Sequence, residues 1–240
     1  MRLLVTRPEP DAGREAELLA ARGHDPVLAP LLEIEFGNAP LPLAGAQALI
    51  VTSRNAIRAL ASHPDLGEAL KLPLFAVGDA TAGAARDLGF TEVVIGPGTA
   101  AALAALIASD LDREHGPLVH LAGDTLAYDV KAALEGQGFA MRKVVLYRAL
   151  PADALPQEAL DPLAAGRLDG VILMSPRTAK TFAALVEKHG LVNQAASLVC
   201  YCLSEAVAEQ LTPLGCEVRV AAQPREEDIL ALLHSETASS

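Results

Sequence analysis

The chain has 240 residues, which suffices for one large domain or two smaller ones. Hydrophobic residues make up 51% of it and aromatic residues only 3%, so the sequence predicts a substantial, mainly aliphatic core. A net charge of −11 argues against a nucleic-acid-binding or anionic-membrane-binding protein, because both need a positive surface. It leaves room for an anionic small ligand, which a local group of backbone N–H donors can hold.

Short apolar runs alternate with amphipathic stretches along the whole chain. The predicted strands are residues 3–5, 26–30 (continuing extended over 31–36), 47–52, 74–77, 92–95, 117–121, 141–150, 169–174, 197–203 and 216–221. The predicted helices are residues 11–22 (with Glu15 and Glu17 on its polar face), 54–62, 80–88, 100–109 (with Thr99 as its N-cap), 125–136, 156–165, 177–189, 204–214 and 225–234. Strands that alternate with helices form parallel sheets, so the fold class is α/β. We expect 235–240 to be a frayed tail.

Cysteine and histidine spacing gives no sign of a metal site or a disulfide framework. Cys200 and Cys202 lie two apart in a predicted strand and should point to the same side, while Cys216 stands apart. We therefore expect buried, reduced thiols and a cytoplasmic protein. The N-terminal apolar run is too short for a signal peptide, and the longest run, 100–108, is too short to span a membrane. The sequence predicts a soluble protein.

Two stretches, 48–60 and 170–182, share one pattern: an apolar strand, a serine and an amphipathic helix. A strand that ends in Ser53 or Ser175 and turns into a helix presents a hydroxyl and free backbone N–H groups at one point. Such a point is a candidate anion-binding corner. Plain N-capping would account for the same two serines.

Further similarities between segments of the chain indicate an internal duplication. Residues 77–82 with Gly89 resemble residues 203–208 with Gly215, and residues 3–8 faintly resemble residues 118–123. Three strand–helix units thus recur in two sets. Two arrangements remain open: a tandem split near residue 117, or a chain that leaves the first lobe early, builds the second and returns. In the second case 31–36 and 142–150 would be the outward and return crossings.

These residues together resemble the uroporphyrinogen-III synthase family. The motifs that carry the resemblance are Val5-Thr-Arg-Pro8, Pro30-Leu-Leu-Glu-Ile34, Thr52-Ser53-x-Asn55-Ala56, Val77-Gly78-x-Ala80-Thr81-Ala82, Gly123-Asp124, Val145-Leu-Tyr147-Arg148, Ser175-Pro176-Arg177-Thr178 and Ser204-Glu205. They fall in the family's order and spacing and cover about residues 1–234.

The resemblance implies two flavodoxin-like parallel-sheet lobes joined by a two-stranded β connector, with lobe 1 at residues 1–35 and 150–240 and lobe 2 at 36–149. It implies a lyase of heme and porphyrin biosynthesis that cyclises hydroxymethylbilane, a linear tetrapyrrole, to uroporphyrinogen III through a spiro intermediate, losing water and inverting ring D. The family needs no metal or organic cofactor. We expect a monomer, because lobes that open and close need to be free, and hand-over of the substrate from hydroxymethylbilane synthase.

For such a reaction the protein must mainly orient its substrate, so binding groups matter more than a catalytic triad. Residues expected to bind substrate are Arg7, Ser53, Arg54, Gly78, Asp79, Thr81, Gly123, Asp124, Ser175, Pro176, Arg177, Ser204 and Glu205. The arginines suit carboxylates, although solvated surface charge is the plain alternative. Tyr147 stands in a matching family position and could donate a proton to the departing hydroxyl, or simply pack in the connector.

Two rival hypotheses come from other classes. A two-lobed binding protein without chemistry would usually be exported, and this chain shows no signal peptide. A catalytically silent relative that binds tetrapyrroles or other anions would show degenerate corners. Val207, which stands in the second set where Thr81 stands in the first, and Ser204 in place of a glycine are mild departures of that kind.

Overall fold

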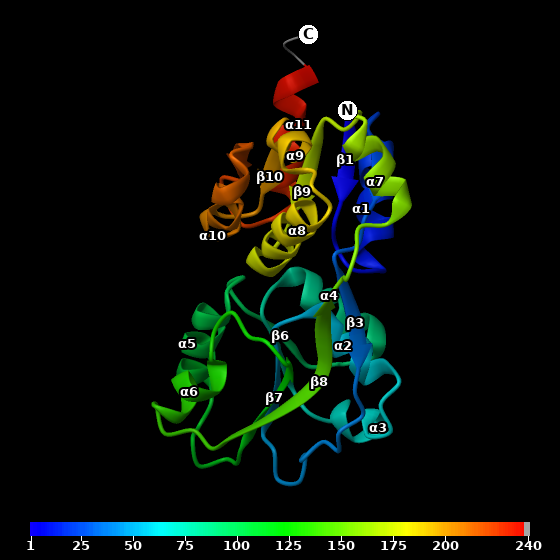
Figure 1. Ribbon diagram of the computed structural model, residues 1–240. Coiled ribbons are helices and arrows are strands. Elements are labelled where there is room, and N and C mark those ends of the chain that lie inside the picture. Colours follow the sequence, from blue (N-terminus) through cyan, green and yellow to red (C-terminus); the bar gives the residue numbers. More distant parts are fainter. Residues whose placement is uncertain (238–240) are drawn as a thin grey trace. The chain divides into compact units, whose positions relative to one another are not determined.

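The computed structural model describes residues 1–237, and its eleven strands form two separate sheets, which are parallel except where β3 pairs with β8 (Figure 1). The first sheet has the order β11-β10-β9-β1-β2 and the second the order β3-β8-β7-β4-β5-β6. By its contacts the chain divides into two compact units, Met1–Glu33 with Leu150–Ser240, here lobe 1, and Ile34–Ala149, here lobe 2. The sheet orders select the second of the two arrangements, in which the chain leaves lobe 1 early and returns to it.

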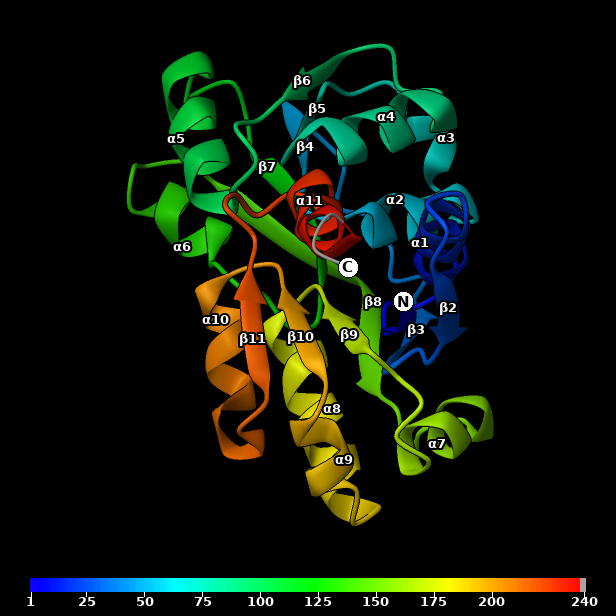
Figure 2. The same cartoon turned by 90° about the horizontal axis from the view of Figure 1, so that it is seen from above.

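Lobe 1 is built from strands that are apolar along most of their length, as buried parallel strands are. Its strands are β1 (Arg2–Val5), β2 (Asp25–Leu28), β9 (Gly170–Leu173), β10 (Val199–Cys202) and β11 (Glu217–Val220), all paired in parallel. Its helices are α1 (Asp11–Ala20), α7 (Gln157–Ala164), α8 (Pro176–Lys188), α9 (Val192–Ala196), α10 (Glu205–Ala208), the 3-10 helix η1 (Glu209–Leu214) and α11 (Glu226–Thr237). Seen from above, β9, β10 and β11 lie side by side (Figure 2).

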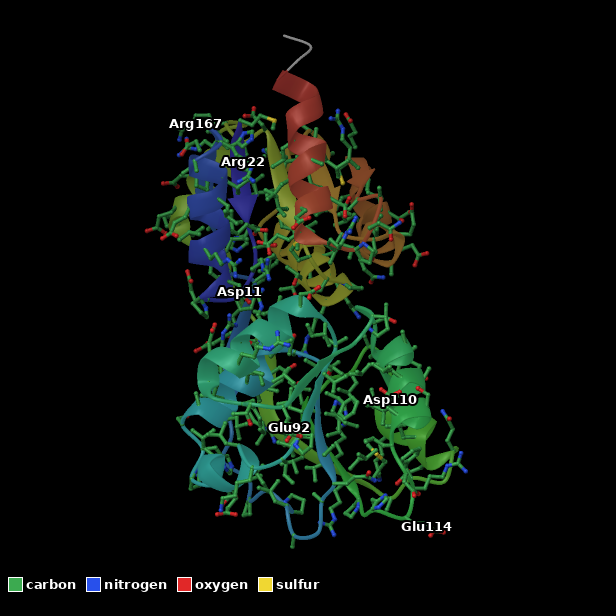
Figure 3. The ribbon with its side chains drawn as sticks, turned by 180° about the vertical axis from the view of Figure 1, so that it is seen from behind. Asp11, Arg22, Glu92, Asp110, Glu114 and Arg167 are labelled. Carbon is green, nitrogen blue, oxygen red and sulfur yellow. The ribbon has the colours of Figure 1, made fainter. Side chains whose placement is uncertain are left out.

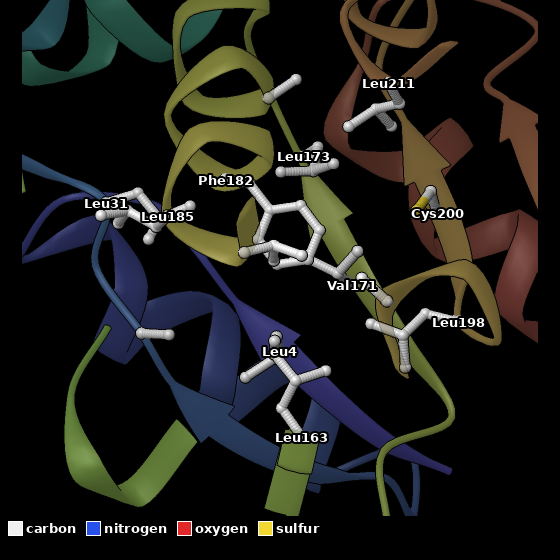
Figure 4. Packing of buried hydrophobic residues seen from close by; sticks show 14 of the residues in the cluster. Leu4, Leu31, Leu163, Val171, Leu173, Phe182, Leu185, Leu198, Cys200 and Leu211 are labelled. Carbon is white, nitrogen blue, oxygen red and sulfur yellow. The ribbon is translucent and has the colours of Figure 1, made fainter. Parts of the chain in front are cut away.

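Helices cover both faces of the lobe 1 sheet. On one face Leu4, Val171 and Cys200 pack against α7, α8, α9 and η1, with Phe182 of α8 at the centre (Figure 4). On the other face the alternate residues, such as Leu3 and Tyr201, pack against α1 and α11. The prediction that Cys200 and Cys202 share a face is confirmed, because both belong to the first of these cores.

Lobe 2 repeats the three-layer plan. Its strands are β3 (Leu32–Phe36), β4 (Ala48–Val51), β5 (Leu74–Ala76), β6 (Val93–Ile95), β7 (Leu118–Gly123) and β8 (Met141–Pro151). Its helices are α2 (Arg54–Ala61), α3 (Leu66–Ala69), α4 (Asp79–Leu88), α5 (Ala100–Asp110) and α6 (Val130–Glu135). Leu49, Val119 and their neighbours face α2, α3 and α4, whereas Ile50, Phe75 and theirs face α5 and α6.

The two crossings of the chain are the neighbouring strands β3 and β8, so the predicted two-stranded connector is confirmed. Along it the Gly37 N–H donates to the Leu146 carbonyl at 2.7 Å, and the Ala152 N–H donates to the Leu31 carbonyl at 2.9 Å. β3 thereby extends the lobe 2 sheet beyond β8, which explains why this sheet has one more strand than that of lobe 1.

Local structure departs from the sequence prediction in five places. The helix predicted over 125–136 begins only at Val130, because the Asp129 carboxylate accepts from the Ala132 N–H and starts it there. The helix predicted over 204–214 is a short α10 followed by the 3-10 helix η1, which contains Pro213. The short helices α3 and α9 were not predicted. Residues 235–237 of the predicted frayed tail belong to α11, and 238–240 lie outside the described residues.

Candidate functional site

The predicted site residues gather at the carboxyl ends of strands in both sheets, which is where open parallel sheets bind ligands. In lobe 2, Ser53 and Arg54 follow β4, Gly78 and Asp79 follow β5, Gly123 ends β7 with Asp124 after it, and Tyr147 lies on β8. In lobe 1, Arg7 follows β1, Ser175, Pro176 and Arg177 follow β9, and Ser204 and Glu205 follow β10. We call these the carboxyl edge of lobe 2 and the carboxyl edge of lobe 1.

Ser53 is the N-cap of α2. Its backbone is extended, and its Oγ accepts from the Asn55 N–H at 3.2 Å, so the chain turns from β4 into the helix at this residue. The same serine lies close enough to the phenol of Tyr147 to act on its pKa. Ser53 therefore both caps its helix and lies beside a neighbouring side chain. Arg54, the first residue of α2, follows it and is half-buried.

A break in strand register sets the position of Tyr147. β7 and β8 pair residue by residue until Ala122 faces Val145, and then Gly123 faces Tyr147, so one residue of β8 is skipped. Such a bulge re-aims the side chains that follow it. The Asp124 N–H donates to the Tyr147 carbonyl at 3.0 Å and fixes the backbone after the bulge.

The Tyr147 ring lies directly against the backbone of Gly123. A Cβ at position 123 would stand 2.7 Å from the ring Cζ and 2.8 Å from the phenol oxygen, closer than a side chain tolerates. Gly123 is thus required by close approach. Burial raises the pKa of the Tyr147 phenol, the hydrogen bond with Ser53 acts against this rise, and the Asp124 carboxylate adds to it. The phenol therefore keeps its proton at neutral pH.

The corner after β5 is less exposed than the sequence suggested. Gly78 is the N-cap of α4 and is half-buried, and Asp79 is exposed. Thr81, by contrast, is only 5% exposed and lies among the buried residues of α4. Thr81 therefore belongs to the buried first turn of α4 more than to the carboxyl edge of lobe 2.

In lobe 1 the two serine corners differ. Ser175 Oγ accepts from the Thr178 N–H at 3.1 Å and lies 2.7 Å from Thr178 Oγ1, so it caps α8, which has Pro176 in its first turn. Ser204 occupies the N-cap position of α10 but makes no side-chain capping bond. Both serines thus stand at helix starts, and only the hydroxyl of Ser175 caps its own helix. Arg177 is half-buried and Glu205 exposed.

Arg7 lies in a cluster of carboxylates. Its guanidinium nitrogens are 3.7 Å from Asp11 and 3.3 Å from Glu226, the latter on α11, and 4.0 Å from Glu15. Arg7 is 14% exposed, and Asp11 stands at the start of α1 (Figure 3). These ion pairs compete with any substrate carboxylate for the guanidinium. The carboxyl edge of lobe 1 is therefore net acidic around the predicted cation.

Glu15 is the titratable residue that the sequence prediction placed wrongly. It is expected on the polar face of the first helix, yet its side chain is 1% exposed and its Oε2 has no hydrogen-bond partner. Burial raises its pKa to about 7 despite the opposing effect of Arg7, with Glu226 and Asp11 adding to the rise. A signal was available, because Glu15 falls on the helical stripe of the buried Ala12 and Leu19.

His120 in β7 is a second buried titratable group that the sequence analysis did not single out. It is 0% exposed, and its Nε2 lies 3.5 Å from Thr52 Oγ1 at the end of β4. Burial lowers its pKa to about 4, and Lys143 contributes in the same direction. His120 is therefore neutral inside the sheet, in keeping with a structural role.

Two hollows on lobe 1 lie away from the carboxyl edge. One, of about 360 Å³, is lined by residues such as Leu168 and Leu198, which precede β9 and β10 and so mark the amino ends of these strands. The other, of about 470 Å³, is lined by Arg2, residues 25–28 and Glu158. Neither contains a predicted site residue. Within residues 1–237 no group of three His, Cys, Asp or Glu side chains could hold a metal ion, and no helix there is long and apolar enough to cross a membrane.

Comparison with known proteins gives consistent results. A family profile described as uroporphyrinogen-III synthase HemD matches residues 14–231. The fold is similar to uroporphyrinogen-III synthetase from Helicobacter pylori, with a TM-score of 0.67 and 19% identity over 98% of each chain. It is also similar to a mutant uroporphyrinogen III synthase from the extremely thermophilic bacterium Thermus thermophilus, with a TM-score of 0.59 and 19% identity over 100% of both chains. No curated protein matches the sequence.

Proposed function

The chain belongs to the uroporphyrinogen-III synthase family, and we propose that the carboxyl edge of lobe 2, built around Tyr147, holds the reacting end of its substrate. The chain is a lyase of heme biosynthesis. It closes hydroxymethylbilane into uroporphyrinogen III with loss of water and inversion of ring D through a spiro intermediate. The family match, which spans most of the chain, does not favour a non-catalytic relative.

The chemistry asks for orientation more than for activation. Loss of the substrate's hydroxyl gives an azafulvene, an electrophile that forms easily, and the decisive step is the attack of ring D through its substituted carbon. Direct closure without this step would give isomer I. Holding the chain in the bent geometry is a proximity effect, which can supply several orders of magnitude in rate. Backbone N–H groups and hydroxyls at the carboxyl edges are suited to holding the substrate's carboxylates.

The position and protonation of Tyr147 are the main reason for placing the reacting end of the substrate at the carboxyl edge of lobe 2. Its phenol keeps its proton, because burial raises its pKa, and the close approach of the Gly123 backbone fixes the position of its ring. A protonated, oriented phenol can donate its hydrogen bond to the substrate's hydroxyl as that group leaves as water. The bulge at Gly123 is what brings the ring to the end of β7. We assign Tyr147 to positioning and proton donation at this step, with the bulge at Gly123 as the feature that positions it.

The carboxyl edge of lobe 1 is proposed to be able to bind carboxylates as well. Ser204 has a hydroxyl that its own helix does not use for capping, and Arg177 is half-buried at the start of α8. Ser175 and the backbone N–H groups of that first turn complete the set. Arg7 contributes only where a substrate carboxylate displaces Glu226, which lies 3.3 Å from it.

The test is a coupled assay in which hydroxymethylbilane is generated in the presence of the purified protein and the oxidised products are separated by isomer. The wild type should give mainly isomer III. Tyr147→Phe should slow its formation by about 10-fold or less, since loss of an obligate acid would cost roughly 10²–10⁴-fold. Tyr128→Phe is the matched control, because Tyr128 is 39% exposed and should tolerate the same change.

Two outcomes would overturn the proposal. Isomer I alone from a folded wild-type protein would remove the enzyme assignment. A Tyr147→Phe variant as fast as Tyr128→Phe would move the reacting end of the substrate away from the carboxyl edge of lobe 2, while leaving the activity itself intact.

Three further proposals concern the cellular setting. We propose a cytoplasmic monomer that receives its substrate from hydroxymethylbilane synthase; the free thiols of Cys200, Cys202 and Cys216 support a reducing compartment. Light scattering on the purified protein tests the oligomeric state. Dilution of labelled bilane by unlabelled bilane in the coupled reaction tests the hand-over, since direct transfer would resist dilution.

A further inference from the structure

Two cysteines of lobe 1 lie with their sulfur atoms in contact. Cys200 lies on β10 and is 0% exposed, and Cys216 directly precedes β11 and is partly exposed. Their Sγ atoms are 3.0 Å apart although the residues are 16 positions apart in the chain. Figure 4 places the Cys200 side chain on its strand within the packed core.

The sheet register explains this contact. β10 and β11 are parallel, and Cys200 faces Val218, so Cys216 lies two residues before the partner of Cys200 and on the same face of the sheet. Gly215, with φ of +65°, turns the chain into β11 just before it. In this diagonal placement the two Sγ atoms are 3.0 Å apart, compared with about 2.05 Å in a disulfide.

We propose that Cys200 and Cys216 form an oxidant-sensitive thiol pair that a peroxide converts reversibly to an intramolecular disulfide. The Cys216 sulfur, as thiolate, attacks one peroxide oxygen; the O–O bond breaks, and the second oxygen leaves as hydroxide and takes up a proton to become water. The Cys200 sulfur then attacks the Cys216 sulfenic acid, the S–O bond breaks, and the released hydroxide takes the Cys200 proton. Two thiols are oxidised, and one peroxide is reduced to two waters.

The surroundings assign the two roles. Cys216 is the partly exposed member, so a peroxide can reach it, and the Cys200 S–H donates to its sulfur and thereby lowers the Cys216 pKa. Cys200 is fully buried and is the resolving thiol. Cys202 is excluded from the pair, because it is 0% exposed, its S–H donates to the Cys200 carbonyl at 3.6 Å, and burial raises its pKa to about 12.

The bond would close a loop that contains α10, η1 and the predicted substrate-binding residues Ser204 and Glu205. A cross-link over a loop of this size restricts the unfolded chain, so oxidation should raise the unfolding midpoint of lobe 1 by roughly 5–10 °C. The disulfide itself does not depend on the proposed function, because it rests only on the two sulfurs and the sheet register.

The experiment treats the reduced protein with hydrogen peroxide, removes the excess with catalase, alkylates it under denaturing conditions and maps the peptides by mass spectrometry. The wild type should lose the mass of two hydrogen atoms, keep one alkylatable cysteine of its three, and regain the others with dithiothreitol. Cys202→Ala should form the same cross-link. Cys216→Ser and Cys200→Ala should form none.

The results that overturn the proposal are a wild type with three alkylatable cysteines, a cross-link that includes Cys202, a disulfide between two chains, or Cys216 oxidised to sulfinic acid without a link. A cross-link without a shift in the unfolding midpoint would contradict the expected stabilisation of lobe 1 by the disulfide. Cys216→Ser keeps all three methionines, so it separates the disulfide from methionine oxidation, and peptide mapping of the wild type stands even where a variant fails to fold.

Discussion

Replacing Glu15 by glutamine should stabilise lobe 1 in alkaline solution and change its stability little in mild acid. The Glu15 side chain is 1% exposed on α1, and its Oε2 has no hydrogen-bond partner. The charged groups that face it are Arg7 after β1, Asp11 on its own helix and Glu226 on α11. One guanidinium thus serves three carboxylates, and the most buried of these carboxylates is the one that is costly to ionise.

The magnitude follows from the shift in pKa. The pKa of Glu15 is 4.5 unfolded and about 7 folded, so the folded state holds its proton where the unfolded state has lost it. Stability is therefore full below pH 4.5, falls as the pH rises between these values, and is lowest above about 7. At about 1.4 kcal/mol per pKa unit, ionised Glu15 costs about 3 kcal/mol in alkaline solution. Glutamine has the same shape and never ionises, so it should remove this cost.

The assay is urea unfolding followed by circular dichroism at about pH 5 and about pH 8.5, on either side of the folded pKa. Glu17→Gln is the matched control, since Glu17 is exposed on the same helix and loses the same charge. We expect the difference in free energy of unfolding between Glu15→Gln and the wild type to increase by about 2–3 kcal/mol from about pH 5 to about pH 8.5. For the control variant this difference should stay nearly constant. A gain independent of pH, or equal in both variants, would refute the buried-carboxyl argument.

Three more predictions concern the edges and the lobe 2 core. Gly123→Ala should displace the Tyr147 ring and reduce isomer III formation at least as much as Tyr147→Phe does, as the coupled assay will show; unchanged activity would contradict the close packing. Ser175→Ala should cost about 1 kcal/mol of stability by chemical denaturation, whereas Ser204→Ala should cost almost none, because only Ser175 caps its helix. The pKa of His120 is lowered from 6.5 to about 4 in the folded protein, so the wild type loses stability as the pH falls through this range. In His120→Gln the free energy of unfolding should depend less on pH between these values. An unchanged pH dependence would contradict the prediction.

The repeating strand–helix units could be predicted from the sequence because their signals are local. Apolar runs such as 48–51, a serine after the strand and a glycine after the helix each act within a few residues of one another. The order of strands could not be predicted in the same way. It depends on which strands pair across distant parts of the chain, and β3 and β8 have the same local pattern whether they pair or not.

The candidate site shows the same limit. Ser53 and Ser175 were predicted to bind anions, with N-capping as the plain alternative; both do cap their helices, and their binding role stays a prediction. The register break that brings Tyr147 against Gly123 left no trace in the residues, because a bulge is a property of two paired strands. Likewise, the contact of Arg7 with Glu226 joins opposite ends of the chain.

The two lobes share a plan but have diverged where ligands bind. In lobe 2 the edge combines a capping serine, a bulge and a protonated phenol, so it offers neutral donors in fixed directions. In lobe 1 the counterpart edge places Arg7 among carboxylates and leaves Ser204 without a capping bond. A polyanionic substrate gains little from an arginine that is already neutralised, whereas neutral hydroxyls and N–H groups cost little to desolvate and bind carboxylates at either edge. In the function proposed above, orientation of the substrate falls mainly to the carboxyl edge of lobe 2.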